Sequence, residues 1–239
     1  MTQRRISKTK VVLSALLLAV FAFLLYQFGL FVMVIWLCFH DPSSSAFMKA
    51  TRAELRRENP DAIIHYEWVP YERISNNLKR AVVASEDANF FTHTGVEWEA
   101  IKKAWQYNRR QADEGSNRMR GGSTITQQLA KNLFLSGSRS YWRKGQELVL
   151  AYMIESVMSK ERILELYLNL AQWGVNVFGA EAAAAHYYRT TAAQLGPSQS
   201  ARLAAMLPNP AYYDKRGVTS YLRSRTSTIQ ARMRLVQIP

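Results

Sequence analysis

Residues 121–132 read GGSTITQQLAKN, and they carry the clearest local structural signal in the chain. The two glycines allow a tight turn or a close approach of the backbone to a ligand. Thr124 and Gln127 have the spacing of a capping box, so we expect a helix over 124–134. Hydroxyls, carboxamides and free backbone N–H groups would surround the positive end of this helix, which favours an anion such as a sugar phosphate. The alternative is an ordinary polar loop and helix cap.

Four basic residues lie within this stretch or shortly after it. They are Lys131, Arg139, Arg143 and Lys144. Near an anionic leaving group such residues would hold a diphosphate, whereas charged residues beside a loop are otherwise a solvated surface. Glu147 comes next, in the middle of a predicted helix, where it would face either solvent or a cleft.

The N-terminal part of the chain predicts a single membrane span. Residues 11–39 contain no Asp, Glu, Lys or Arg, and as a helix they would be about 43 Å long against a hydrocarbon core of about 30 Å. A cleaved signal peptide is the alternative, but the apolar run is too long and no small-x-small site follows it. Residues 1–10 are basic without an acidic residue, so we predict that they form a cytoplasmic tail and that residues 40 onward lie across the membrane.

The composition of the chain narrows the class of partner. The formal net charge is +13, from 31 Lys and Arg against 18 Asp and Glu, which favours nucleic acid, phospholipid head groups or a phosphorylated substrate. No nucleic acid partner is expected, because the basic residues would face away from the cytoplasm and no readout motif occurs. The only cysteine, Cys38, lies in the span, so the part beyond it can form neither a disulfide nor a thiolate metal site.

The sequence after the span divides into two parts. Residues 40–73 are predicted as a linker and juxtamembrane region, with a charged surface helix over 46–59 and a short strand over 63–69. Residues 74–239 are predicted as one mainly α domain, because they show no βαβ alternation. Helices are expected at 75–87, 96–110, 124–134, 141–159, 160–171, 180–185, 197–207 and 219–236.

The spacing of apolar residues predicts which helix faces are buried. In the helix over 96–110, Ile101, Ala104 and Trp105 are expected to face the core. Pro208 and Pro210 are expected to stop the helix over 197–207. The apolar stripe of the helix over 160–171 consists of Ile163, Leu164, Tyr167 and Leu168.

Residues 86–95 read EDANFFTHTG and form a second candidate site. Two acids at the C-terminal end of a helix oppose its dipole, and such local conflicts tend to mark functional residues. Flanking aromatic residues would desolvate Glu86 and suit it to act as a general base; a solvated acidic turn is the alternative. Glu86 and Glu147 together would supply the paired carboxylates of glycosyl transfer. His93 is expected to be a hydrogen-bonded structural residue, because no second His or Cys stands at ligand spacing.

Five motifs in order resemble the peptidoglycan glycosyltransferases of family 51, in their monofunctional, membrane-anchored form. The motifs are residues 86–95 (E-D-x-x-F-x-x-H-x-G), 121–132 (G-G-S-T-I-T-Q-Q-x-x-K-N), 143–147 (R-K-x-x-E), 160–169 (K-x-x-I-L-x-x-Y-L-N) and 203–210 (the L-A-x-x-L/P-x-x-P type). The resemblance implies a lysozyme-like glycosyltransferase domain on an N-terminal transmembrane helix. Such an enzyme polymerises lipid II into β-1,4-linked glycan with inversion, outside the inner (cytoplasmic) membrane, and releases undecaprenyl diphosphate.

The resemblance also implies roles for individual residues. Glu86 resembles the general base that takes a proton from the acceptor 4-hydroxyl, and Glu147 resembles a second essential carboxylate near the leaving group. Lys131 and Arg139 look like the cations that hold the donor diphosphate, helped or replaced by a divalent ion, Mg²⁺ or Mn²⁺; no organic cofactor is implied. The other residues implied on the donor side are Ser123, Thr124, Gln127, Gln128, Asn132, Arg143 and Lys144, and the further motif residues are Asp87, Phe90, His93 and Gly95.

The partners implied by the resemblance are lipid II, the growing lipid-linked glycan strand, membrane lipids and other wall-synthesis or division proteins. Two other functions compete with this one. A lytic transglycosylase or hydrolase on the same fold would cut glycan with one acid over the glycosidic oxygen, and it has no need for a basic diphosphate site. A non-catalytic, membrane-anchored scaffold for wall synthesis would keep its cellular role after the substitution Glu86→Gln.

Overall fold

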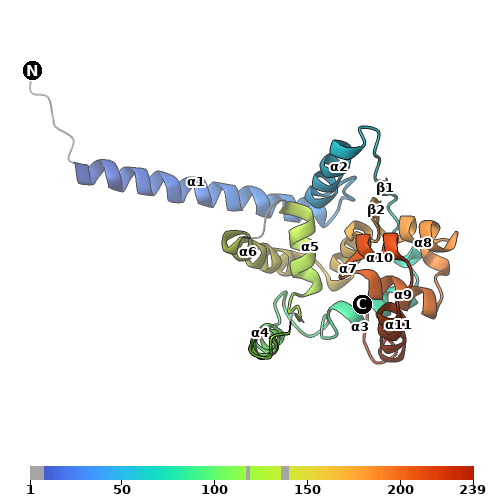
Figure 1. The fold of residues 1–239 in the computed structure, drawn as a ribbon. Helices are drawn as coiled ribbons and strands as arrows, with labels where there is room; N and C mark the ends of the chain where they lie inside the picture. Colours follow the sequence, from blue (N-terminus) through green and yellow to red (C-terminus); the bar gives the residue numbers. More distant parts are fainter. Residues whose placement is uncertain (1–7, 117–118, 136–139) are drawn as a thin grey trace, which may run out of the picture. The chain divides into compact units, whose positions relative to one another are not determined.

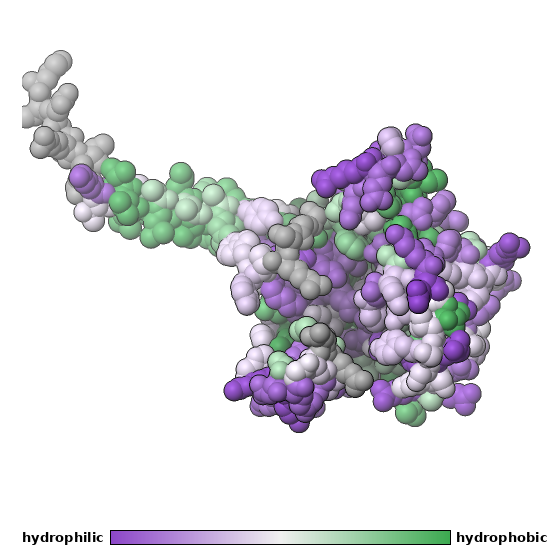
Figure 2. Space-filling view, viewed as in Figure 1, coloured by the Kyte–Doolittle hydropathy of each residue, from purple (hydrophilic) through white to green (hydrophobic). Residues whose placement is uncertain are grey.

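The structure is a computed structural model that describes residues 8–116, 119–135 and 140–239 (Figure 1). The chain divides into two units, of which the first ends at His40 and the second comprises Asp41–Pro239. The first unit contains helix α1 (Lys8–Leu37), the one helix in the described residues that is long and apolar enough to cross a membrane. Its exposed side chains are mostly apolar and are green in Figure 2. Helix α1 covers nearly all of the predicted span and fits a membrane anchor.

The second unit is mainly helical, which confirms the predicted fold class and is consistent with a lysozyme-like domain. Its described helices are α2 (Ala46–Glu58), α3 (Asn76–Glu86), α4 (Trp98–Asp113), α5 (Ile125–Phe134), α6 (Tyr141–Val157), α7 (Lys160–Leu170), α8 (Ala180–Tyr188), α9 (Pro197–Met206), α10 (Pro210–Arg216) and α11 (Ser220–Arg232). Two strands, β1 (His65–Tyr66) and β2 (Val177–Phe178), pair in parallel, and two short 3₁₀ helices cover Tyr71–Arg73 and Ala192–Gln194.

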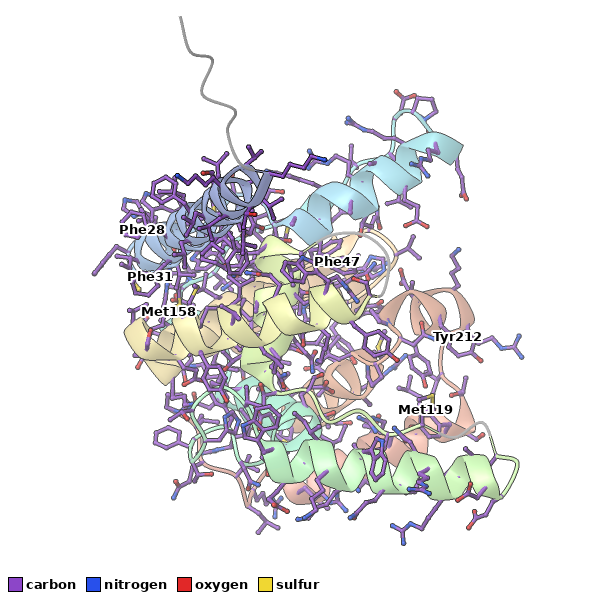
Figure 3. The ribbon with its side chains drawn as sticks, turned by 90° about the vertical axis from the view of Figure 1, so that its left-hand side faces the viewer. Phe28, Phe31, Phe47, Met119, Met158 and Tyr212 are labelled. Atoms are coloured by element: carbon purple, nitrogen blue, oxygen red, sulfur yellow. The ribbon has the colours of Figure 1, made fainter. Side chains whose placement is uncertain are left out.

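Helices α5 and α7 form the centre of the second unit. Helix α5 packs against α2, α6 and α7. All four residues of the predicted stripe in α7 are buried, and Leu166, Asn169 and Leu170 are buried as well, so α7 is enclosed on most of its surface. At the edge of this centre, Phe47 of α2 (labelled in Figure 3) packs edge-on against Phe178, with ring centroids 5.9 Å apart. Helix α9 packs against both α3 and α11, which also touch each other (Figure 1).

The segment over 41–73 belongs to the same unit as residues 74–239. The strand predicted over 63–69 is shorter than expected, because β1 contains only His65 and Tyr66. At Val69, the last residue of the predicted strand, the Asn169 side chain stands in for a strand partner: its Oδ1 accepts from the Val69 N–H, and its Nδ2 donates to the Val69 carbonyl, each at 2.9 Å. Both backbone groups of Val69 are therefore satisfied by a side chain in place of a second strand.

One further prediction was wrong. Trp105 was expected to face the core, but its side chain is 62% exposed, and it lies beside Arg109 with 5.6 Å between the ring and the guanidinium carbon. Ala104 is the one buried residue of α4. Gly122 packs directly on the α4 backbone, where a Cβ would be 2.9 Å from the Ile101 Cα. The helix over 197–207 ends at Met206, before Pro208, as predicted, and Pro210 then begins α10, where its fixed φ suits the first turn.

Candidate active site

The end of α3 meets the beginning of α5 at Asp87, and this contact resolves the conflict that the sequence suggested. Asp87 is buried, and its Oδ2 accepts a hydrogen bond from the Ile125 N–H at 3.0 Å. The carboxylate therefore lies at the positive N-terminal end of α5, where a negative charge is stabilised. Of the two acids at the end of α3, Asp87 joins two helices, and Glu86 is left for another role.

The loop after Asp87 is held by His93, as predicted for a structural histidine. His93 Nε2 lies 2.9 Å from both Asp87 oxygens, while its Nδ1 accepts from the Gly95 N–H at 3.1 Å. These partners assign the proton to Nε2 and a neutral ring. Gly95 has φ +90°, and a Cβ there would lie 2.8 Å from the Glu155 Cγ, so the position requires glycine. Phe90 is fully buried beside the His93 ring.

The predicted capping box at the start of α5 is confirmed. Thr124 is the N-cap, its Oγ1 accepts from the Gln127 N–H at 3.1 Å, and the Gln127 Oε1 accepts from the Thr124 N–H at 3.0 Å. Thr124 Oγ1 also donates to the Gly95 carbonyl at 2.6 Å, which ties α5 to the loop after Asp87. Both side chains are buried. They fix the backbone of the first turn of α5 and present no exposed polar group of their own.

Glu86 is held at both of its oxygens. Gln128 Nε2 donates to Oε2 at 3.0 Å, and Ser85 Oγ donates to Oε1 at 3.0 Å. Gln128 is itself held by the Tyr167 hydroxyl, which donates to its Oε1 at 2.9 Å. Burial, and then the charges of Glu86 and Asp87, raise the pKa of Tyr167 well above its usual value, so it stays a neutral donor. The Glu86 side chain is 11% exposed, so the carboxylate is only partly accessible to solvent.

Arg225 of α11 completes this group, and the sequence did not single it out. Its Nη2 lies 3.9 Å from Glu86 Oε1 and donates to Ser85 Oγ at 3.1 Å. The sequence predicted only a basic C-terminal helix. The spacing of the apolar residues Leu222 and Ile229 could have identified it. They lie on one side of that helix, and residue 225 falls on the same side. We call Ser85, Glu86, Gln128 and Arg225 the carboxylate group.

A second set of polar residues lies on α5 and α6, and we call Lys131, Arg143 and Lys144 the cation group. Burial lowers the pKa of Lys131; Glu147 and Glu86 act in the opposite direction, whereas the positive charges of Arg143 and Lys144 lower it further. Lys131 is therefore close enough to interact with both carboxylates. Within the described residues its Nζ has no hydrogen bond or ion pair, and the buried Nε of Arg143 has no hydrogen-bond partner. Arg139 lies outside the described residues.

Glu147 faces this cation group and is not a surface residue. Its side chain is 7% exposed, and its Oε1 lies 2.5 Å from Lys144 Nζ. Lys144 Nζ also donates to Ser123 Oγ at 3.0 Å, which connects α6 to the segment before α5. Asn132 is buried on α5, one turn beyond Gln128. The described residues contain no group of three His, Cys, Asp or Glu side chains that would hold a metal ion by themselves.

The described site residues thus form two groups beside α5, the carboxylate group and the cation group. Buried motif residues such as Asp87 hold the helices that carry them. A carboxylate fixed from two sides stands near unpaired cations, which suits the removal of a proton from one substrate group while negative charge develops on another. A hydrolase would need no such cation group beside its carboxylate.

Comparison with known proteins agrees with this chemistry. The family model described as Transglycosylase matches residues 55–234. The biosynthetic peptidoglycan transglycosylase of Bordetella pertussis is 64% identical over 238 residues, which cover 100% of this chain and 98% of the relative. The protein of that name from Bordetella avium is 63% identical over the same shares of both chains. Its namesake from Herminiimonas arsenicoxydans is 54% identical over 224 residues, covering 94% and 95%.

Proposed function

This chain belongs to the transglycosylase family and is a peptidoglycan glycosyltransferase of cell-wall synthesis, and from that premise we propose that Glu86 is the general base of its reaction, with lipid II and the growing glycan strand as substrates. The observation that carries the proposal is the carboxylate of Glu86, fixed by Ser85 and Gln128 and close to the unpaired Lys131. A base held in one orientation needs little rearrangement when the acceptor binds.

The reaction that fits this geometry is a single displacement at C1 of the donor sugar. The 4-hydroxyl oxygen of the acceptor forms the new bond to C1, and its proton passes to the Glu86 carboxylate. The bond between C1 and the diphosphate oxygen breaks, so undecaprenyl diphosphate leaves with the electron pair. Attack opposite to the leaving group inverts the configuration at C1, which gives the β-1,4 linkage.

The cation group would stabilise the leaving diphosphate. Lys131 lacks a partner in the described residues, and the Nε of Arg143 is buried without one, so a bound diphosphate would satisfy both. Lys144 and Ser123 would add donors once Lys144 shifts from Glu147. Because a diphosphate leaves without full protonation, fixed positive charge takes the place of the general acid that a glycosidase requires. Arg139, outside the described residues, is proposed to join this group.

A divalent ion at this site would be held by the Glu147 carboxylate together with phosphate oxygens of the substrate. One carboxylate with substrate phosphates is a usual environment for Mg²⁺. The Glu147 carboxylate suits such an ion because it is buried at the edge of the cation group, where its Oε1 is paired with Lys144. The ion would supply additional positive charge near the leaving group. In its absence the cation group supplies that charge alone.

We also propose that α1 anchors the enzyme in the inner membrane, with residues 1–10 in the cytoplasm and the second unit outside. The length and composition of α1 support a span, and the basic residues before residue 11 support the orientation. A lipid-linked substrate lies in the plane of the bilayer, so an anchored enzyme meets it at high local concentration. Protease accessibility in spheroplasts, with a tag at each end of the chain, tests the orientation.

Glu86→Gln tests the proposed base. We expect polymerisation of lipid II to fall about 100- to 10,000-fold, because the amide cannot accept the acceptor proton. Binding of a diphosphate-mimicking inhibitor should persist, because the cation group is unchanged. Glu58→Gln, an exposed residue of α2, is the matched control and should retain full activity. Product sizing before and after muramidase digestion distinguishes polymerisation from cleavage. Retained polymerisation in Glu86→Gln would exclude this role, and loss of inhibitor binding would make Glu86 a structural residue.

A further inference from the structure

Arg225 is not placed like the other basic residues of α11. Leu222, Ile229 and Met233 form the buried side of this helical segment, and Arg225 follows Leu222 by three residues, so it lies on the same side. Its neighbours Arg223 and Arg232 are exposed. The packing of α11 against α3 and α9 therefore directs the Arg225 guanidinium toward the end of α3, and the side chain is only 29% exposed.

The contacts of Arg225 concentrate on one carboxylate. Within the described part of the chain, Glu86 is the only acidic residue within 4.0 Å of its guanidinium nitrogens. Among the described residues, its one hydrogen bond runs from Nη2 to Ser85 Oγ, at 3.1 Å. Its Nε is buried and has no hydrogen-bond partner in the described residues. Leaving a buried donor without a partner costs free energy, and such exceptions tend to occur where function requires the orientation.

Ser85 links the guanidinium to Glu86. Its hydroxyl can donate one hydrogen bond, and two acceptors lie near it: Glu86 Oε1 at 3.0 Å and the Ala204 carbonyl at 3.4 Å. Arg225 donates to the same oxygen, so the Ser85 hydrogen must point to one of these acceptors. The closer and charged acceptor is Glu86. A cationic donor on Ser85 also polarises the hydroxyl and strengthens its bond to the carboxylate.

We propose that Arg225 is a positioning residue for Glu86 and that it acts through the Ser85 hydroxyl. Ser85, next to Glu86 on α3, donates to Oε1 and is itself held by Arg225 from α11, while Gln128 donates to Oε2 from α5. The carboxylate is thereby held between two helices that are distant in sequence before the acceptor binds. This inference rests on the proposed role of Glu86 as the base.

Steady-state kinetics on the full-length enzyme test the inference. Arg225→Ala should lower kcat for lipid II polymerisation about 100-fold, because a displaced base reacts poorly, and it should leave KM within about twofold. Guanidinium ion added to the assay should restore part of kcat, and Arg225→Lys should have an intermediate kcat. Arg223→Ala removes the same charge from the exposed side of α11 and should leave kcat unchanged. A raised KM with unchanged kcat would instead mean that Arg225 binds substrate directly, which would overturn the proposal.

A double-mutant cycle tests the route through Ser85. If Arg225 acts through that hydroxyl, Ser85→Ala alone should lower kcat about as much as Arg225→Ala, and the double variant should be no worse than either. Multiplicative losses would overturn the relay. Should Arg225→Ala fail to fold in thermal unfolding, Arg225→Lys in the Ser85→Ala background makes the same test, because it should change kcat no further. Unchanged kcat in the Arg225 and Ser85 variants beside an inactive Glu86→Gln would refute only the relay. Active Glu86→Gln would refute the proposed function itself.

Discussion

The carboxylate group and the cation group both include a residue of α5, Gln128 and Lys131, and they differ in how far the protein satisfies them. Both Glu86 oxygens accept hydrogen bonds, from Gln128 and from Ser85. In the cation group, Lys131 Nζ has no partner among the described residues, and the buried Arg143 Nε has none either. The first group is complete before substrate arrives, whereas the second is left with unpaired positive charge. The difference indicates that the protein fixes the orientation of the base before substrate binds, whereas the cation group stays unpaired until it binds the anionic part of the substrate.

Among the variants that test the difference between the two groups, Lys131→Ala is expected to have the largest effect. Removing the unpaired cation should weaken binding of a diphosphate-mimicking inhibitor about 10- to 100-fold, because a charge-assisted contact of that size is lost. The acceptor should be much less affected, since it binds beside Glu86. Titration of the inhibitor by fluorescence, with Lys103→Ala on the exposed side of α4 as control, measures the change. Equal weakening of donor and acceptor binding would contradict a division of labour between the two groups.

A smaller effect is expected from Asp87→Asn, which tests the support behind the carboxylate group. The amide keeps an acceptor for the Ile125 N–H, but it loses the negative charge at the start of α5 and one of the two acceptors near His93 Nε2. We expect the free energy of unfolding to fall by about 2 kcal/mol, which corresponds to a decrease of about 4–8 °C in melting temperature. Asp113→Asn, at the exposed end of α4, should leave the melting temperature unchanged. An equal change in both variants would show that Asp87 does not join α3 to α5.

The same comparison shows what the sequence could predict and what it could not. The Thr124 and Gln127 capping box depends on residues three apart, so its spacing was enough to predict it. Arg225 could not be assigned to Glu86, because the contact joins residues more than a hundred positions apart through the packing of α11 on α3. The strand over 63–69 was overestimated for a similar reason, since Asn169 takes the backbone groups of Val69. Periodicity indicated that α4 is amphipathic but not how narrow its buried side is, and Trp105 was misplaced.

The smallest expected effect is the pH dependence of inhibitor binding and of the free energy of unfolding. It separates the role of Lys131 in binding from its effect on stability. Burial lowers the pKa of Lys131 from 10.5, so in the folded protein it loses its proton at a lower pH than in the unfolded chain. Between these two pKa values the unfolded chain binds more protons, and the contribution of Lys131 to the free energy of unfolding therefore rises with pH. Inhibitor binding should fall over the same pH range, because the cation is being lost.

Lys131→Arg should remove both trends, because a guanidinium keeps its charge at every pH at which the protein is folded. We would measure inhibitor affinity and urea unfolding from neutral to alkaline pH in the wild type and in this variant. The opposite slopes of affinity and stability should appear in the wild type and be absent from Lys131→Arg. The same slopes in both proteins would mean that another group titrates in this pH range, and that inhibitor binding does not depend on the charge of Lys131.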